Sequence, residues 1–335
     1  MKKLINIFLV LILVLFFVAS ANTAEEGSKS DKFSIIEPVV NSMFEGELID
    51  IVIKANDVGL NTITVTKNGG DVWNVLVTKG KEYYCKTIVL EYGPNELVFN
   101  ATRDGKIIES KKVNVFFRAD ISKEFRRSPP EFQKKEFHQG SRDSVCNPCH
   151  RVDITEKDIK PLKPENSVCH QCHKKIAVYN YVHGPVSRGD CLRCHNKESK
   201  PVRFATQKPD SELCFICHKE KKDEWAPKKY MHGPAATGKC TICHNAHASN
   251  NIAWLRKPSW DLCVTCHEDR ASGAHVVIGF TPGSTHPTRG KPDPVRYGKE
   301  ISCASCHSPH ASNSKSLFPN DAPSFDGLCQ MCHKM

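Results

Sequence analysis

The sequence predicts a multidomain protein in which a β-sandwich is followed by a long region of loops and short helices. Residues 33–118 contain short stretches in which apolar and polar residues alternate, with turn signals between them. Residues 138–335 instead hold 16 of the 17 cysteines and all 16 histidines, and their apolar runs are short. A change of composition of this kind indicates two unlike domains.

The first domain is predicted from its period-two patterns, which occupy residues 47–56, 61–70, 71–80, 83–93, 95–105 and 110–118. Asn68-Gly69, Gly93-Pro94 and Asp104-Gly105 separate these stretches, and short strands at regular spacing are typical of a β-sandwich. The segment YGPNELVFNATRDG resembles the signature of bacterial immunoglobulin-like modules, which implies an Ig-like sandwich over 33–118. We expect Cys85, in one of these strands, to be a small buried side chain.

The amino terminus, MKKLINIFLVLILVLFFVASANTAEEG, has two lysines, an apolar run and then Ala19-Ser20-Ala21. This pattern predicts a signal peptide over residues 1–21. We therefore expect an exported protein, in the periplasm or at the cell surface. The alternative is a retained anchor, so that the membrane would be contacted only through an uncleaved signal segment.

The cysteines of the second domain form eight copies of Cys-x-x-Cys-His. Residues 119–137, which precede them, are rich in charge and proline and are predicted to be a linker with little to pack. The sixteen cysteines of the motifs are Cys146, Cys149, Cys169, Cys172, Cys191, Cys194, Cys214, Cys217, Cys240, Cys243, Cys263, Cys266, Cys303, Cys306, Cys329 and Cys332.

Three kinds of site use cysteines at this spacing: a disulfide framework, zinc sites and covalently attached c-type haem. The histidine decides among them, because a disulfide has no use for it, whereas a haem bound through two thioethers takes the next residue as its proximal iron ligand. Zinc remains the alternative, although thiolate zinc sites belong mostly to reducing compartments. We expect eight covalent haem c groups, with proximal ligands His150, His173, His195, His218, His244, His267, His307 and His333.

An internal repeat organises the motifs into four two-haem units. His138, His183 and His232 each precede a motif cysteine by eight positions, and His286 stands before Cys303 with a longer insertion. Motifs preceded by apolar residues alternate with these along the chain. Repeats of about 45 to 54 residues indicate modules stacked on their neighbours. The architecture predicted for 138–335 is therefore a chain of haems rather than one round globule.

The paired motifs with an upstream HGP and a C-x-x-C-H-x-x-H pattern resemble the doubled-CXXCH family of multihaem c-type cytochromes. The resemblance covers residues 138–335 and implies a haem-packed octahaem domain. Two motifs depart from the pattern, because Asp153 and Glu198 stand where the trailing histidine would be.

Eight histidines lie outside the motif position, which is one for each iron and would allow two histidine ligands on every haem. Residues three apart on a helix share a face, so His247 is expected to bind a neighbouring iron rather than the iron of His244. Methionine ligation is not expected as the general plan. The predicted distal ligands are His138, His170, His183, His232, His247, His275, His286 and His310.

Six-coordinate haems of low potential indicate electron transfer rather than catalysis, because they leave no open position for substrate. We expect a carrier between other redox proteins, such as cytochromes or membrane-bound oxidoreductase complexes, and no enzyme. The formal charge of +10 is offset by haem propionates, so nucleic-acid binding is not expected. Two alternatives stay open: a reductase of a small nitrogen or sulfur oxyanion or hydroxylamine with one five-coordinate haem, and a self-associating filament.

Overall fold

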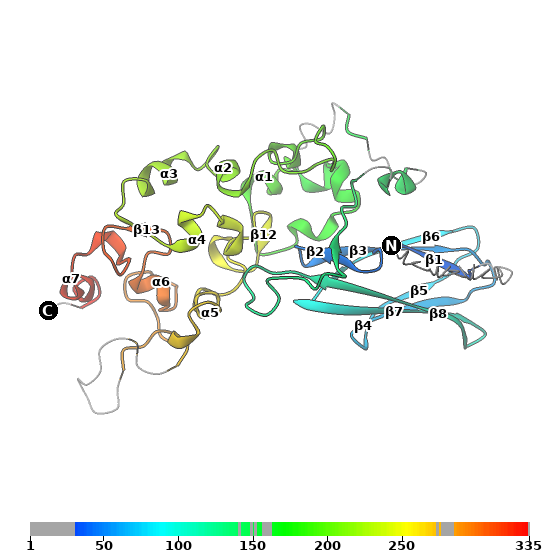
Figure 1. The fold of residues 1–335 in the computed structure, drawn as a ribbon, viewed down its shortest axis with the longest axis horizontal. Helices are drawn as coiled ribbons and strands as arrows, with labels where there is room; N and C mark the ends of the chain where they lie inside the picture. The colour runs from blue at the N-terminus through cyan, green and yellow to red at the C-terminus, as the bar shows by residue number, and fades with distance from the viewer. Residues whose placement is uncertain are drawn as a thin grey trace, which may run out of the picture.

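The computed structural model describes residues 31–139, 142–147, 150, 153–155, 163–272, 275 and 285–333. The signal peptide expected over 1–21 lies outside these residues, and so does Cys149. The sandwich occupies one end of an elongated molecule, and the last helix, α7 (Phe325–Cys329), lies at the other end (Figure 1).

The sandwich consists of two sheets. The smaller has the order β1-β3-β6, and the larger has the order β5-β4-β7-β8-β2-β9. The strands are β1 (Phe33–Glu37), β2 (Ser42–Phe44), β3 (Leu48–Ala55), β4 (Thr62–Lys67), β5 (Gly70–Leu76), β6 (Tyr83–Val89), β7 (Gly93–Arg103), β8 (Lys106–Phe117) and β9 (Gln133–Lys134).

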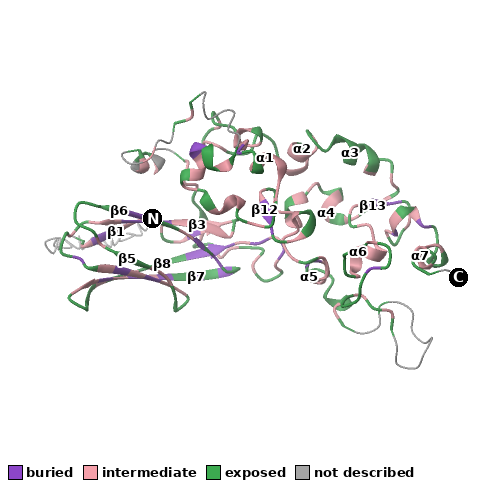
Figure 2. Ribbon diagram, turned by 180° about the vertical axis from the view of Figure 1, so that it is seen from behind, coloured by how far each residue is buried: buried purple, intermediate pink, exposed green. Residues whose placement is uncertain are grey.

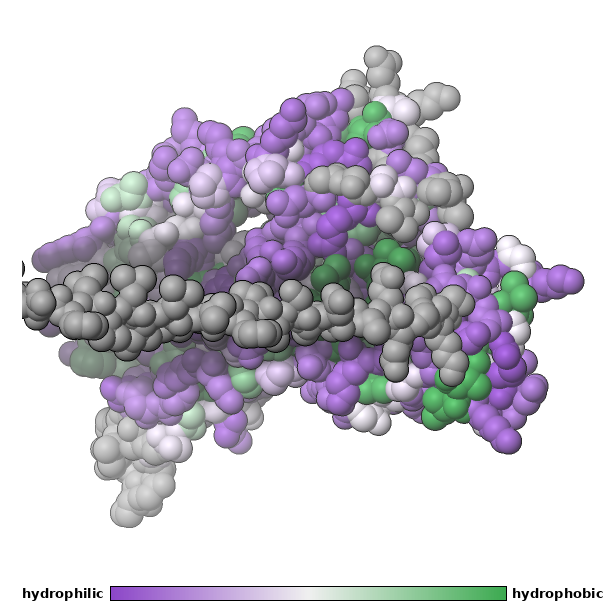
Figure 3. Space-filling model, turned by 45° about the vertical axis from the view of Figure 1, so that its right-hand side comes forward, coloured by the Kyte–Doolittle hydropathy of each residue, from purple (hydrophilic) through white to green (hydrophobic). Residues whose placement is uncertain are grey.

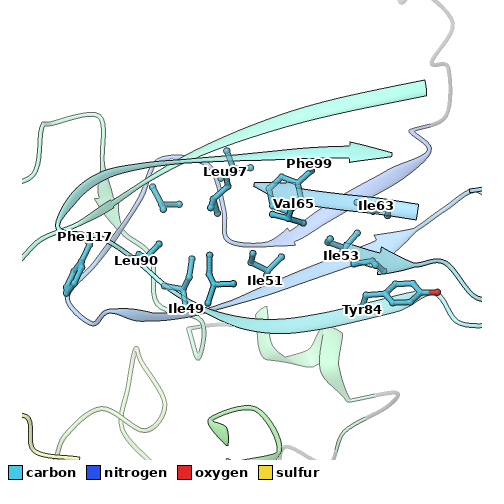
Figure 4. Packing of buried hydrophobic residues seen from close by; sticks show 14 of the residues in the cluster. Ile49, Ile51, Ile53, Ile63, Val65, Tyr84, Leu90, Leu97, Phe99 and Phe117 are labelled. Carbon is cyan, nitrogen blue, oxygen red and sulfur yellow. The ribbon is translucent and has the colours of Figure 1, made fainter. Parts of the chain in front are cut away.

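The hydrophobic core lies between the two sheets. Alternate residues of a strand point to opposite faces, so Ile51 and Ile53 of β3 face Leu97 and Phe99 of β7 across the interior (Figure 4). All four are fully buried. The prediction that the apolar residues of the period-two pattern face the core of a sandwich is therefore confirmed.

Two tight turns join strands of the larger sheet. Asn68 and Gly69 have φ of 50° and 82°, and Asp104 and Gly105 have φ of 49° and 74°. Positive φ at both central residues is the geometry that favours Asn-Gly and Asp-Gly in two-residue hairpins. The expected burial of Cys85 is wrong, because its side chain is on the exposed face of β6.

The segment after the sandwich, residues 119–137, was expected to pack little, but it packs closely. Ala119 and Ile121 are buried with the sandwich core. Phe125 makes an edge contact with Phe116, and β9 extends the larger sheet beside β2. The prediction relied on the charged residues and prolines of this segment and did not account for its apolar side chains.

The motif region is built from short helices and two-residue strands. Its strands form the pairs β10 (Tyr181–Val182) with β12 (Ala248–Ser249) and β11 (Tyr230–Met231) with β13 (Ala311–Ser312). The other α-helices are α1 (Gly184–Ser187), α2 (Asp210–Cys214), α3 (Lys219–Trp225), α4 (Gly233–Ala236), α5 (Ser259–Val264) and α6 (Cys303–Cys306).

Single turns of 3-10 helix make up much of the rest. They are η1 (Arg142–Cys146), η3 (Pro164–Asn166), η4 (Val168–Gln171), η5 (Lys174–Ala177), η6 (Cys191–Arg193), η7 (Cys240–Ile242), η8 (Ile252–Trp254), η9 (Glu268–Arg270) and η10 (Pro319–Asp321). The loop-rich, short-helical character predicted for this region is confirmed.

The motif region has little protein core of its own. Its buried apolar side chains within the described residues are Val168, Ala248, Leu262, Ala311, Phe318 and Ala322. Figure 2 accordingly shows buried residues concentrated in the sandwich, with intermediate and exposed residues around the motifs. The outer surface seen in Figure 3 is mostly hydrophilic. None of the helices in the described part of the chain has the length and apolarity to cross a membrane.

The sandwich and the motif region are in direct contact. Tyr179 donates a hydrogen bond to Glu47 (3.0 Å), and Lys123 pairs with Glu268 (2.7 Å). Leu262 of α5 belongs to the same apolar cluster as the sandwich core. These contacts fix the sandwich against the repeats.

Candidate multihaem site

Every motif folds into the same turn. The backbone N–H of the motif histidine donates to the carbonyl of the first cysteine in all eight motifs, at 2.8–3.1 Å. Helical residues three and four positions apart lie on one face. In the seven motifs that are described in full, the spacing therefore places the two cysteines and the histidine on the same side of one turn.

The structure brings fourteen of the sixteen histidines together in seven pairs. Each pair joins one motif histidine to one predicted distal histidine. The distances between ring centroids are 6.4 Å for His138–His173, 6.1 Å for His183–His218, 6.0 Å for His195–His247, 6.1 Å for His232–His267, 6.0 Å for His244–His310, 6.0 Å for His275–His307 and 6.2 Å for His286–His333.

His150 and His170 remain outside these pairs. All sixteen histidines belong to the described residues, and no ring contact joins His150 to another histidine. The Nδ1 atom of His170 is buried without a hydrogen-bond partner in the described structure. The structure therefore does not bring His170 to a motif histidine.

His247 lies opposite a motif histidine of another unit. Its ring faces His195 at 6.0 Å, not His244, and His310 takes the place opposite His244. His247 and His195 belong to neighbouring repeats. The proposal that trailing histidines reach across to another motif thus has a geometric basis.

Three motif histidines have a further contact that the sequence did not indicate. The Nδ1 atoms of His195, His244 and His307 lie 2.8, 2.7 and 2.7 Å from the backbone carbonyls of Phe204, Ala253 and Ser316. Each carbonyl is nine residues after the histidine. A neutral imidazole that donates from Nδ1 has Nε2 free as a metal ligand, so this contact fixes the tautomer and the ring orientation.

The three contacts share one feature in the sequence, which is that nine residues separate the histidine from the residue that supplies the carbonyl. The backbone near them has positive φ, with 63° at Phe204, 56° at Ala253 and 54° at Leu317. Residues other than glycine occupy this region at a cost in conformational energy. The loop that brings each carbonyl under its histidine is therefore a constrained one.

Two distal histidines are held neutral by their surroundings. Burial, followed by the nearby His195, lowers the pKa of His247 to about 4. Burial, followed by His244, lowers the pKa of His310 to about 4. Neutral imidazole is the form that binds a metal ion.

Short strands carry these histidines in linked sets. The N–H of His183 donates to the carbonyl of His247 (2.9 Å), and β10 and β12 pair directly beside this contact. The same arrangement links His232 to His310 (2.8 Å) through β11 and β13. One short ladder thus fixes two distal histidines that belong to different pairs.

The cysteines of successive motifs lie close together in sequence order. In three units the second cysteine of one motif affects the second cysteine of the other. Burial raises the pKa of Cys194, Cys243 and Cys306, and the nearby Cys217, Cys266 and Cys332, respectively, raise it further. Burial raises the pKa of Cys172 in the first unit, and Cys146 is among the neighbouring charges that raise it further. Between units the first cysteines shift each other's pKa in the pairs Cys169–Cys191, Cys214–Cys240 and Cys263–Cys303, and the sulfurs of Cys214 and Cys240 lie within 4.8 Å of each other.

The histidine spacing fits an iron between the two rings. An imidazole nitrogen binds a metal at about 2.0 Å and the ring centroid is about 1.1 Å further away, so two rings on opposite sides of one metal have centroids about 6.2 Å apart. The buried Nε1 of Trp254 also has no hydrogen-bond partner in the described structure. A region with little core and such an atom fits a large bound group.

Zinc fits less well. The cluster of metal-ligating atoms found in the described residues consists of Asp210, Cys214 and Cys240, all within 4.8 Å of one another. A structural zinc site needs four ligands arranged as a tetrahedron. The motif histidines lie in pairs with other histidines, not in this cluster.

Comparison with known proteins identifies the repeats. The sequence profile of the doubled CXXCH motif matches residues 183–223, 232–272 and 293–335. The C-terminal half carries three copies of this motif. Paired CXXCH motifs imply a multihaem c-type cytochrome with covalently attached haem, and such cytochromes are extracytoplasmic in bacteria. No curated protein matches the chain.

Two solved structures that resemble the chain each match about a quarter of it. The sulfur carrier protein SoxY from Chlorobium limicola f thiosulfatophilum is 13% identical, with 26% of this chain and 80% of that chain covered and a TM-score of 0.22. The fibronectin(III)-like modules of Clostridium thermocellum CbhA are 16% identical, with 25% and 94% covered and a TM-score of 0.20. At these scores neither protein supports a functional argument.

Proposed function

We propose that this multihaem cytochrome is an octahaem electron carrier whose haems are predominantly bound by two histidines. The observation that supports the proposal is the set of seven histidine pairs with ring centroids 6.0–6.4 Å apart. An iron with protein ligands on both faces has no position for substrate. Electron transfer without bond making is the chemistry that such a site allows.

The haem itself would supply reversible one-electron chemistry, and the chain sets its conditions. The two cysteines of each motif would tether one porphyrin through two thioethers. The carbonyls of Phe204, Ala253 and Ser316 orient three motif histidines through their Nδ1 atoms, which leaves Nε2 for the iron. Histidine on both sides gives a low potential compared with methionine ligation.

The neighbouring cysteines support an electron path that follows the sequence. Neighbouring cysteines alternate along the chain. The second cysteines are neighbours within a unit, as where burial and then the nearby Cys217 raise the pKa of Cys194. The first cysteines of adjoining units, such as Cys214 and Cys240, have sulfurs within 4.8 Å of each other. Porphyrins attached at neighbouring points are close to one another. We infer that electrons pass from the motif at His150 to the motif at His333, or in the opposite direction.

The partners would be other redox proteins on the outside of the cytoplasmic membrane. The predicted signal peptide and the covalent haem both favour export to the periplasm or the cell surface. The sandwich, at one end of the molecule, is positioned to dock a partner or to act as a spacer (Figure 1).

Haem counting and spectroscopy on the purified exported protein test this proposal. We expect eight haems per chain by pyridine haemochrome and by mass, with a predominantly low-spin ferric electron paramagnetic resonance spectrum. A redox titration should show low midpoint potentials throughout. A colourless protein, or one whose haems are mostly high-spin, would contradict the proposal.

A further inference from the structure

The seven histidine pairs follow a rule that assigns each distal histidine to a motif. His138, His183, His232 and His286, which begin the four units, each face the second motif histidine of their own unit. The trailing histidines His247 and His310 face the first motif histidine of the preceding unit, which is His195 and His244 respectively. The first motif of a unit therefore depends on the next unit for its partner.

The rule explains the two departures from the doubled motif. A trailing histidine at position 153 would have no preceding unit to serve, so Asp153 is consistent with the rule. A histidine at position 198 would serve His150, but Glu198 stands there. His307, in the fourth unit, has His275 opposite it.

The backbone around Glu198 also differs from the later units. In those units the carbonyl of the trailing histidine accepts the N–H of the histidine that begins the preceding unit. His138 instead accepts the N–H of Arg203 at its own carbonyl (2.9 Å), and Gln139 bridges to Val202. The contact thus comes four to five residues after Glu198 along the chain.

The side chain of Glu198 does not replace the missing imidazole. It is 79% exposed and lies 3.6 Å from Lys197, while its N–H donates to the side chain of Asn196. A carboxylate in this position is solvated. The trailing position of the second unit therefore supplies no imidazole for His150.

His170 is the remaining candidate for that place. It lies inside the second motif, in η4, where its N–H donates to the carbonyl of Ser167 (3.0 Å). The turn that holds Cys169 and Cys172 thereby fixes its backbone. Its ring makes no contact with the ring of His150, although both residues are described.

We propose that His150 is the motif histidine with no histidine opposite it, and that an iron held there would keep one position for a small ligand from solution. The inference rests on the proposed function, because His150 must first carry a haem. It gives the electron carrier one iron, at the sandwich end of the haem series, that can bind an external molecule.

Carbon monoxide titration of the reduced, full-length holoprotein tests the assignment. We expect one carbon monoxide bound per wild-type chain, measured from the change in the Soret band, and a matching high-spin ferric signal in the oxidised protein. His247→Ala should raise the binding to two, because it uncovers the position opposite His195. His170→Ala should leave it at one.

Each other outcome overturns the assignment. If the wild type binds none and His170→Ala binds one, His170 is the sixth ligand. If neither binds carbon monoxide, the position opposite His150 is closed by another group. Two or more per wild-type chain would place an open iron among the seven pairs.

The proposed function fails in a different way. Haem content by pyridine haemochrome must equal that of the wild type in both variants before the binding is compared. If His247→Ala keeps eight haems and still gains no site, the pairing of histidines across iron is wrong. In that case the two-histidine ligation in the proposed function is contradicted, whatever the wild type binds, while a haem count below eight would contradict the octahaem proposal.

Discussion

Gly93 shows how a single residue fixes the way the chain leaves the sandwich. Its φ is +88°, and a Cβ placed there would lie 2.6 Å from the ring of Phe125. Phe125 in turn contacts Phe116 at the end of β8. The absence of a side chain at Gly93 thus lets residues 119–137 lie close against the sandwich.

Replacing Gly93 by alanine should destabilise the sandwich more than the same change at Gly105, in the turn between β7 and β8. Gly93→Ala and Gly105→Ala both put an alanine at positive φ, which costs about 1–2 kcal/mol. A Cβ at position 105 has no atom within 4 Å, whereas a Cβ at position 93 must also displace the ring of Phe125. Chemical denaturation should show a larger loss for Gly93→Ala. Equal losses would mean that Phe125 moves aside freely.

The sequence could predict some site residues better than others. The cysteines and histidines of the motifs follow from local spacing, because one helical turn brings them to one face. The pairing of His247 with His195 is not local, since these residues come from different units and meet beside the two-residue strands β10 and β12. The carbonyl of Ala253 could not be found from side-chain chemistry, because any residue supplies one.

Among the secondary-structure elements, α3 has a role beyond connecting two motifs. Trp225, its last residue, stacks on His310 with the ring centroids 4.3 Å apart and the planes 11° apart. The ring of His244 also lies near His310, with the centroids 6.0 Å apart. The helix therefore restricts the rotation of a distal histidine.

Loss of this stacking should change the haem of His244 alone. Trp225→Ala removes one of the surfaces that orient His310, so we expect its low-spin signal in electron paramagnetic resonance to broaden or shift. Trp260→Ala is the matched control, because Trp260 stacks with the guanidinium of Arg289 (4.0 Å) instead of a histidine. Identical spectra for Trp225→Ala and the wild type would remove this role.

The strands of the sandwich were more predictable than the segment after it. Period-two alternation and Asn-Gly or Asp-Gly turns specify β4, β5, β7 and β8 locally. The packing of residues 119–137 depends on the exposed edge of β2 and on Phe116, both of which are distant in sequence. Cys85 could not be assigned a face by its residue type, because cysteine occurs in both environments.

For the whole molecule, the sandwich and the repeats share an apolar contact. Leu262 of α5 is 9% exposed and belongs to the apolar cluster of the sandwich core, against which Leu255 also packs. The ion pair of Lys123 with Glu268 is largely solvated, and pairs of this kind contribute at most about 1 kcal/mol. The apolar contact is therefore the main fixed point between the two parts.

Truncation of Leu262 should loosen this junction. Leu262→Ala is expected to cost about 2–4 kcal/mol through lost burial and the cavity it leaves. Ile252→Ala, at a side chain that is 48% exposed, should change stability by less than about 0.5 kcal/mol. Thermal unfolding measures the stability, and small-angle scattering should show a broader distribution of shapes for Leu262→Ala. An unchanged distribution would show that the polar contacts suffice.

The crossed assignment of His247 and His310 has a consequence for biogenesis. A chain exported amino end first would present His195 before His247 has emerged, and His244 before His310. Each of these sites could mature only when the segment behind it has reached the same compartment. Maturation would then proceed one step behind secretion, and the last segment to arrive would complete the segment before it.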